Sequence, residues 1–266
     1  MKGIFDSHAH YFDTRYDRET DGADTVLQEV FSSGIGTIIN VATNNTNVER
    51  CLAQAQKYPG MYAAIGIHPE DAQQLDLDPD SELETLEKML AEAASHKIVA
   101  LGEIGFDYHY EPVNYDIQKN FFERQMQLAE KYHLPVIIHD REAHGDCFDM
   151  ICRFPNVKGV FHSYSGSAEM ARELVRRGWY ISFSGVVTFK NAERVRKVAS
   201  TIPADRLLAE TDCPYLAPHP NRGKINRSDY MSYTIATLAE LFEISSENMI
   251  ELTRKNAETL FNLCDC

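Results

Sequence analysis

Short apolar segments alternate with longer amphipathic segments along the whole chain. Each apolar segment is continuous and rich in isoleucine and valine, which is typical of strands that are buried on both faces of a sheet. The predicted strands are residues 3–8, 37–41, 61–67, 98–103, 135–139, 157–162, 180–184 and 206–209. Because strands alternate with helical segments, the sheet is expected to be parallel.

The segments between these strands carry apolar residues at helical spacing. A capping box at residues 81–84 predicts a helix start, and Leu83, Leu86 and Leu90 follow on one face. Further helices are predicted before Pro135, after Ala168, and at about 228–243 and 246–262. The acidic stretch 68–80 is expected to be a surface loop.

The number of strand–helix units predicts the fold. Eight units in 266 residues fit a closed barrel, because (β/α)8 barrels commonly have about 250 residues. A glycine-rich phosphate motif does not follow the first strand, which argues against an open dinucleotide-binding sheet. We therefore predict an α/β protein with a (β/α)8 TIM barrel, formed as a single domain over residues 1–266.

The composition restricts the possible partners. The net charge of −14 argues against a broad basic surface for nucleic acid or membranes, although bound cations can invert the local field at a site. No apolar stretch approaches the roughly 18 residues of a membrane helix, and no signal peptide precedes the first strand. The six cysteines lack metal-type spacing and are expected to be reduced. We expect a cytoplasmic protein with no membrane contact and no obligate protein partner.

Metal-binding side chains stand at the ends of the predicted strands. The first strand ends with His8 and His10, which lie two residues apart and therefore point to the same side. Four later strands end with Glu103, His139, His162 and Asp212. Because the carboxyl ends of barrel strands meet at one face, we expect all of these side chains to gather there.

These six side chains exceed what one small cation needs. They match two divalent ions about 3.5–4 Å apart that share a bridging carboxylate and a bridging water. Glu103 is the expected bridge, because it is the only carboxylate at the end of a central strand. The expected ligands of one ion are His8, His10 and Asp212, and those of the other are His139 and His162. Each of these residues alone could have an ordinary structural role, such as a member of a buried ion pair or the cap of a helix. The occurrence of all six at strand ends favours a metal site.

The motifs around these residues resemble a known family. The segments 5–10, 64–69, 102–108, 135–139, 161–166 and 210–216 are similar to those of the TatD family of metal-dependent deoxyribonucleases in the amidohydrolase superfamily. The resemblance extends from residue 4 to Phe261. The chain departs from it at Ser228, where many members carry proline, and at Ser163-Tyr164, where Cys-Phe is common.

This resemblance implies a barrel of the metallo-dependent hydrolase type with two metal ions, for which Mg²⁺, Mn²⁺ and Zn²⁺ are candidates. It also implies hydrolysis of DNA phosphodiester bonds, with the 3′-to-5′ exonuclease activity described for members. The six strand-end residues then take the ligand roles given above. Asp212 is additionally expected to accept a proton from the attacking water, so that Asp212 and Glu103 are the predicted catalytic residues.

Substrate contacts are expected from donors around the metal site. Arg222 and Lys224 follow the eighth strand with Arg227, at a barrel position often used for phosphate, and Ser163 follows the sixth strand. The alternatives are a basic loop paired with acidic neighbours and, for Ser163, a helix N-cap. His68, at the end of the third strand, is expected to line the pocket.

The loop after Glu103 carries Phe106, Tyr108 and Tyr110, which either stack an unpaired base or pack the loop. Asp107 is expected to form a hydrogen bond with a ligand histidine. An acidic chain with a local cationic clamp should bind short or single-stranded DNA ends, with a shallow dependence on salt.

Two other functions fit the same residues. A two-metal barrel also cleaves other esters, lactones or aminoacyl substrates, and the basic residues after the eighth strand favour an anionic substrate only moderately. A barrel that binds without catalysis is disfavoured, because degenerate members of such folds lose metal ligands and this chain keeps all of them.

Overall fold

The structure is a computed structural model that describes residues 2–74 and 77–263. Its parallel strands follow one another through one sheet in sequence order, which is the order of a (β/α)8 barrel. The strands are β1 Ile4–Ala9, β2 Ile35–Val41, β3 Met61–Ile65, β4 Ile98–Asp107, β5 Val136–Arg141, β6 Gly159–Phe161, β7 Tyr180–Phe183 and β8 Leu207–Ala209. Every strand predicted from the sequence is confirmed, and so is the fold class.

The described residues fall into two compact units, one comprising residues up to Asn40 together with those from His162 onward, and the other comprising Val41–Phe161. The prediction of a single domain over 1–266 stays a prediction. The helices of the first unit are α1 Arg15–Glu19, α2 Ala23–Ser32, α8 Ala168–Arg176, α9 Glu193–Ala199, α10 Met231–Leu241 and α11 Ser246–Leu260. The helices of the second unit are α3 Asn45–Lys57, α4 Pro69–Gln74, α5 Pro79–Leu90, α6 Tyr115–Tyr132 and α7 His144–Cys152.

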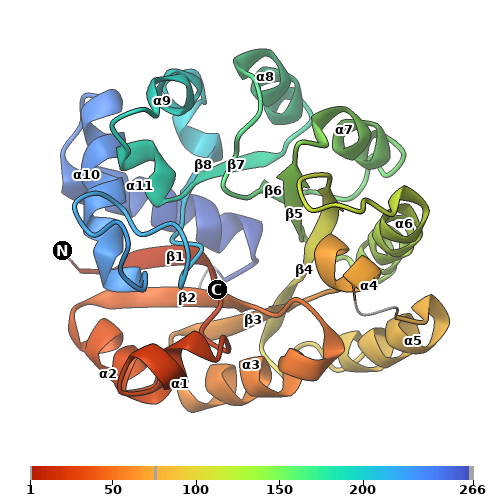
Figure 1. Cartoon of the computed structure of the whole chain (residues 1–266). Helices are drawn as coiled ribbons and strands as arrows, with labels where there is room; N and C mark the ends of the chain where they lie inside the picture. Colours follow the sequence, from red (N-terminus) through yellow and green to blue (C-terminus); the bar gives the residue numbers. More distant parts are fainter. Residues whose placement is uncertain (1, 75–76, 264–266) are drawn as a thin grey trace. The chain divides into compact units, whose positions relative to one another are not determined.

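In the first unit the two ends of the sheet meet. β1 pairs with β2, β7 pairs with β8, and Ala9 forms a parallel bridge with Cys213 beyond the end of β8. The backbone amide of His10 donates to the carbonyl of Cys213 at 2.7 Å, and the amide of Asp212 donates to the carbonyl of His8 at 2.9 Å. Helix α11 lies along β1 and β8 (Figure 1). The backbones of the predicted ligands therefore form this junction.

In the second unit, β3 to β6 pair in order, and α6 packs against β4 (Figure 1). Two buried glutamines of α6 bind the backbone at the strand ends. Gln125 accepts from the amide of Ile67 at 2.7 Å and donates to its carbonyl at 3.1 Å, and Gln118 does the same for Asp107 at 2.9 and 2.8 Å. These bonds hold the backbone just after β3 and at the end of β4, so they help to position His68 and Asp107.

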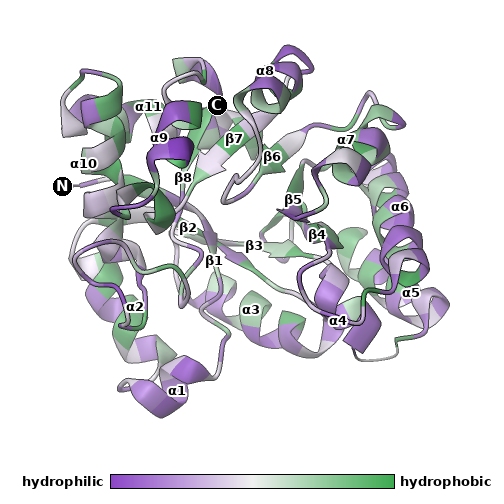
Figure 2. Ribbon diagram, turned by 45° about the horizontal axis from the view of Figure 1, so that its top comes forward, coloured by the Kyte–Doolittle hydropathy of each residue, from purple (hydrophilic) through white to green (hydrophobic). Residues whose placement is uncertain are grey.

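The apolar residues of both units lie on the strands and on the inner faces of the helices. Figure 2 shows hydrophobic colouring on strands such as β3 and β6 and hydrophilic colouring on surface helices such as α1 and α9. This pattern is what parallel strands covered on both faces require. Among the described helices, none has the length and the apolar character needed to cross a membrane.

Three local predictions are corrected. Helix α5 begins at Pro79, and the carboxylate of Asp78 caps it by accepting from the amide of Ser81 at 3.0 Å, so the capping box at 81–84 does not start this helix. The stretch 68–80 is not only loop, because it contains α4. Helix α10 begins after a 3-10 turn at Ser228–Tyr230 rather than at Ser228 itself.

The cysteine prediction holds where the structure describes it. The described cysteines are free thiols: Cys51, Cys147, Cys152 and Cys213. Cys264 and Cys266 lie outside the described residues.

Candidate metal centre

One cluster of metal-type ligands lies in the first unit, at the end of β1 and in the loop after β8. The Nε2 atoms of His8 and His10 are 3.0 Å apart, and Oδ1 of Asp212 is 3.3 Å from Nε2 of His10 and 3.7 Å from Nε2 of His8. Ligands bound tetrahedrally at about 2.0–2.2 Å from one ion lie roughly 3.3–3.6 Å from each other. The predicted ligand set of one ion is therefore gathered at distances that suit an ion.

His162 lies in the same unit, directly against this cluster. Its ring stacks on that of His8 with centroids 4.1 Å apart and an angle of 13° between the planes. Nδ1 of His162 lies 3.4 Å from Oε1 of the buried Glu210, which also accepts from the amide of Ser163 at 2.7 Å. Glu210 thus positions the segment after β6. The sequence prediction missed this role, although Glu210 stands in the same motif as Asp212.

The pKa of Asp212 lies below its usual value, although the side chain is only 15% exposed. Burial alone would raise the pKa of Asp212, but the hydrogen bond to His10 and the charges of His8 and His162 bring the pKa below its usual value. The backbone of Asp212 adopts the left-handed conformation with φ of 57°, which aspartate tolerates better than most residues. Such conformations are found preferentially at functional sites.

A buried hydrogen-bond network lies beside this cluster, around Asp6. The carboxylate of Asp6 accepts from the amide of His8 at 3.3 Å, from the amide and hydroxyl of Thr211 at 3.0 and 2.7 Å, and from the hydroxyl of Ser228 at 2.6 Å. Burial raises the pKa of Asp6 to about 6 despite these bonds. Asp6 thereby holds the ligand-bearing end of β1 to the loop after β8. The sequence prediction assigned Asp6 no role, and its place in the first motif was the only signal.

A second cluster lies in the second unit, within β4 and β5 and in the segment just after β3. Oε1 of Glu103 is 2.6 Å from Nδ1 of His139 and 3.6 Å from Nε2 of His68. The other ring nitrogen of His139 is 2.9 Å from the carboxylate of Asp107, so the predicted contact between Asp107 and a histidine of the site is confirmed. Burial favours the neutral acid at Asp107, but the hydrogen bond to His139 lowers its pKa.

His68 belongs to this second cluster, although the sequence predicted only that it lines the pocket. Its Nδ1 atom accepts from the backbone amide of Glu70 at 3.1 Å. In the neutral ring the proton therefore lies on Nε2, which faces Glu103. In this form His68 donates from Nε2 toward Glu103; to bind an ion through Nε2 it would carry its proton on Nδ1 and give up the hydrogen bond from Glu70.

Both clusters fit divalent metal ions. Each brings together three imidazole or carboxylate ligand atoms that lie within 4.8 Å of one another: His8, His10 and Asp212 in one unit, and His68, Glu103 and His139 in the other. Imidazole and carboxylate donors suit ions such as Zn²⁺, Mn²⁺ or Fe²⁺. The chain can therefore hold metal in each unit, and the assignment of each predicted ligand stays a prediction.

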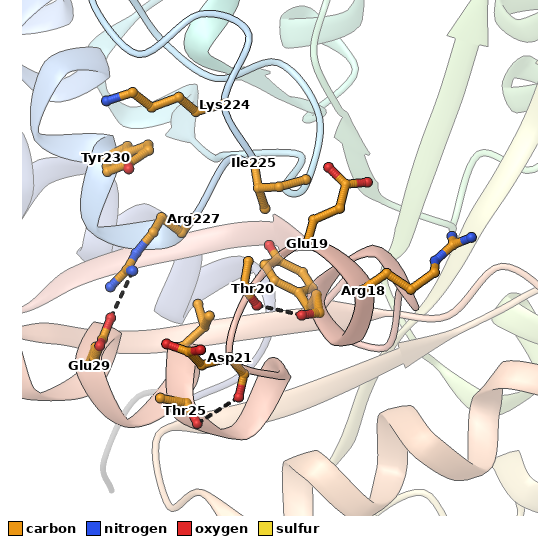
Figure 3. A pocket seen from close by; sticks show the side chains of 12 residues that line it. Arg18, Glu19, Thr20, Asp21, Thr25, Glu29, Lys224, Ile225, Arg227 and Tyr230 are labelled. Atoms are coloured by element: carbon orange, nitrogen blue, oxygen red, sulfur yellow. Dashed lines mark hydrogen bonds and ion pairs between the residues drawn. The ribbon is translucent and has the colours of Figure 1, made fainter.

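The predicted cationic clamp is smaller than the sequence suggested. Arg227 pairs with Asp229 at 2.6 Å and with Glu29 at 2.9 Å, so the alternative of a basic residue paired with acidic neighbours is confirmed there. Figure 3 shows the ion pair with Glu29 in a pocket of the first unit. Acidic and basic residues balance in the lining of this pocket: Glu19, Asp21 and Glu29 against Arg18, Lys224 and Arg227.

Arg222 and Lys224 keep the charges expected of a clamp. Arg222 is exposed, and its guanidinium carbon lies 4.2 Å from the centroid of the Phe189 ring, with no carboxylate partner among the described residues. Lys224 is exposed and donates to the side-chain oxygen of Asn221 at 3.1 Å. Their contact with substrate stays a prediction.

The remaining predicted contacts have mixed outcomes. The N-cap of α8 is Ser167, so the capping alternative for Ser163 is wrong, and the Ser163 hydroxyl instead lies 2.9 Å from that of Ser184. Phe106 is buried and packs edge-on against Phe122 with ring centroids 5.2 Å apart, which confirms packing for this ring. Tyr110 remains 41% exposed.

Comparison with known proteins agrees with this geometry. The model of the family described as TatD related DNase matches residues 5–262. YabD of Bacillus subtilis, named an uncharacterized metal-dependent hydrolase, is 38% identical over 98% of this chain and 99% of its own length. YcfH of Escherichia coli, named in the same way, is 32% identical over 98% of this chain and 96% of its own length.

A solved structure supports both the fold and the family. The crystal structure of YjjV, a TatD homologue from Escherichia coli K12, superposes with a TM-score of 0.88 at 32% identity and covers 97% of this chain and 98% of that chain. A TM-score of 0.88 over nearly the whole of both chains shows that they share this fold. The chain therefore belongs to the TatD related DNase family and is a metal-dependent hydrolase.

Proposed function

We propose that this hydrolase cleaves DNA phosphodiester bonds with two divalent ions and removes nucleotides from the 3′ end. The observation that supports the proposal is that each unit of a chain in this DNase family has its own largely shielded cluster of imidazoles and a carboxylate on or just after the strands. In a (β/α)8 barrel the carboxyl ends of the strands form the active face. The proposed ligands are His8, His10, Glu103, His139, His162 and Asp212.

The two ions, when bound, polarise the phosphoryl oxygens and lower the pKa of a water molecule toward neutrality. Mg²⁺, Mn²⁺ and Zn²⁺ are the candidates, and the imidazole content of the clusters favours the latter two for tight binding. Glu103 is the proposed bridge between the ligand sets. Its contacts with both His68 and His139 show that one carboxylate reaches two imidazoles of the second unit.

Asp212 is the proposed proton acceptor. Its pKa lies below the usual value, so the carboxylate is ionised near neutral pH and free of a proton before the reaction. It takes the proton of the attacking water and passes it toward the leaving oxygen. The left-handed backbone of Asp212 and the hydrogen bond between its amide and the carbonyl of His8 fix the carboxylate for this step.

The proposed contacts to the substrate phosphate are few. Arg222, exposed and with no carboxylate partner among the described residues, is the main candidate, and Lys224 is the second. His68 offers Nε2–H as a neutral donor, and Ser163 offers a hydroxyl. A clamp of this size grips one or two phosphates, so we propose short or single-stranded DNA ends as the substrate and a shallow dependence of binding on salt.

The test is product analysis with end-labelled single- and double-stranded DNA in the presence of Mg²⁺, Mn²⁺ or Zn²⁺. We expect shortening from the 3′ end, a loss of roughly 100-fold or more in kcat for Asp212→Asn with metal content retained, and a raised KM for Arg222→Ala. His96→Ala is the matched control, because His96 is paired with Glu92 on the surface. Hydrolysis of lactones or neutral esters by a metal-loaded protein that leaves DNA intact would overturn the proposal.

A further inference from the structure

An exposed tyrosine, Tyr215, lies next to the candidate metal ligands of the first unit. Tyr215 is 47% exposed, the most exposed of the large hydrophobic side chains in the described part of the chain. Its backbone amide donates to the carbonyl of Asp212 at 2.9 Å. Its ring centroid lies 6.2 Å from that of His10, with an angle of 81° between the planes. Tyr215 is therefore held against two of the proposed ligands.

The ring of Tyr215 is rigidly supported on one face. The guanidinium carbon of Arg15 lies 3.9 Å from the ring centroid. Asp13 fixes this guanidinium, with Nε of Arg15 3.2 Å from both carboxylate oxygens and the terminal nitrogen 2.7 Å from Oδ2. The hydroxyl of Tyr215 donates to the same Oδ2 atom at 3.4 Å. The three side chains thus hold one another in place before any ligand binds.

The charge of this group differs from that of the proposed phosphate clamp. The carboxylate of Asp13 neutralises Arg15, and hydrogen bonds from Arg15 lower the pKa of Asp13 although burial opposes this. Arg222, by contrast, lacks a carboxylate partner among the described residues. The surface of Tyr215 and Arg15 is therefore planar and nearly neutral, which suits a nucleobase better than a phosphate.

We propose that Tyr215, supported by Arg15 and Asp13, is a stacking platform for an unpaired nucleobase of the substrate. The inference rests on the proposed function and specifies it further. A base stacked beside His10 and Asp212 would present its own phosphodiester to the metal cluster. A base inside a duplex is already stacked on both faces and paired, so the platform selects single-stranded or frayed ends.

The first test measures binding without cleavage. The probe is a short single-stranded oligonucleotide with 2-aminopurine at its 3′ end and phosphorothioate linkages that resist hydrolysis, added to the metal-loaded protein. Stacking on Tyr215 should quench the fluorescence, and Tyr215→Leu should remove the quenching and weaken binding about 10-fold. Tyr215→Phe keeps the ring and should retain both. Tyr233→Leu, which alters another exposed tyrosine on α10, is the matched control.

The second test compares kcat/KM for an oligonucleotide and for the same oligonucleotide with an abasic 3′-terminal nucleotide. Tyr215→Leu should reduce the preference for the intact substrate about 10-fold. An equal loss on both substrates would overturn the platform and leave Tyr215 as a support of the metal cluster. If the protein quenches the 2-aminopurine fluorescence but does not cleave DNA, the stacking platform is upheld and the proposed function fails. If the protein cleaves DNA and Tyr215→Leu changes neither binding nor cleavage, the stacking platform alone is refuted.

Discussion

Replacing Ser228 by alanine removes one of the four hydrogen bonds to the buried carboxylate of Asp6, the one at 2.6 Å. A hydrogen bond to a charged group contributes about 1.5–3 kcal/mol, so Ser228→Ala should lower the free energy of unfolding by that amount at pH 8. At about 2–3 °C per kcal/mol in a chain of this size, Tm should fall by roughly 3–9 °C.

The loss should depend on pH, and its direction follows from the pKa of Asp6. Burial raises this pKa from 3.8 to about 6 in the folded protein, so the folded state binds more protons than the unfolded chain between these values. This difference in pKa contributes about 3 kcal/mol to the free energy of unfolding. The contribution is fully present below pH 3.8 and is lost as the pH rises through 6. Without the Ser228 hydroxyl the folded pKa rises further, so the variant continues to lose stability above pH 6.

The assay is urea unfolding of the chelator-treated protein from pH 5 to pH 8, because a bound ion would add its own pH dependence. The difference between wild type and Ser228→Ala should grow with pH. Ser200→Ala removes an exposed hydroxyl that donates to the carbonyl of Lys197 and should change stability by less than about 0.5 kcal/mol at every pH. A Ser228→Ala deficit that is the same at pH 5 and pH 8 would refute the assigned charge state of Asp6.

Three further predictions concern the metal and the second unit. Chelation should abolish hydrolase activity and a divalent ion should restore it, measured by turnover against bound metal; activity that survives complete metal removal would contradict the family assignment. Asp107→Asn should weaken metal binding about 10- to 100-fold in a competition titration, because His139 loses the carboxylate that orients its ring. An unchanged metal affinity would show that His139 does not need the carboxylate of Asp107. Gly105→Ala should lower the free energy of unfolding by more than about 3 kcal/mol, because the added Cβ would lie 1.9 Å from the carbonyl oxygen of His139. Gly145→Ala on α7 is the control and should be neutral or stabilising, because an added Cβ meets no atom within 4 Å there. Similar melting curves for the two variants would refute this contrast.

The strands were predictable because each is a continuous apolar segment, and this pattern survives any arrangement of the helices. The end of β4 was not predictable from the sequence. The residues from Ile104 to Asp107 follow the glycine–glutamate pair and belong to the strand only because they pair with β5. The start of α5 was misplaced because two capping signals stand three residues apart. Asp78 with Pro79 at the first turn prevails over the box that begins at Ser81.

The chemistry of the site was predictable from strand ends, but the partners of its residues were not. Arg227 and Arg222 are five residues apart and indistinguishable by pattern, yet only Arg227 meets Glu29, which lies 198 residues away in the chain. In the same way, the platform at Tyr215 depends on Arg15, from the other end of the sequence. A single sequence shows residue types and spacing, whereas contacts over such separations follow from the closed order of the strands.

The junction between β1 and the loop after β8 has a consequence for biosynthesis. Asp6 and Thr211, which the junction joins, are separated by 205 residues. During translation the ribosome makes the two histidines of the first strand about 200 residues before their carboxylate partner. A chain that stops before residue 212 therefore lacks the carboxylate of this candidate ion-binding triad.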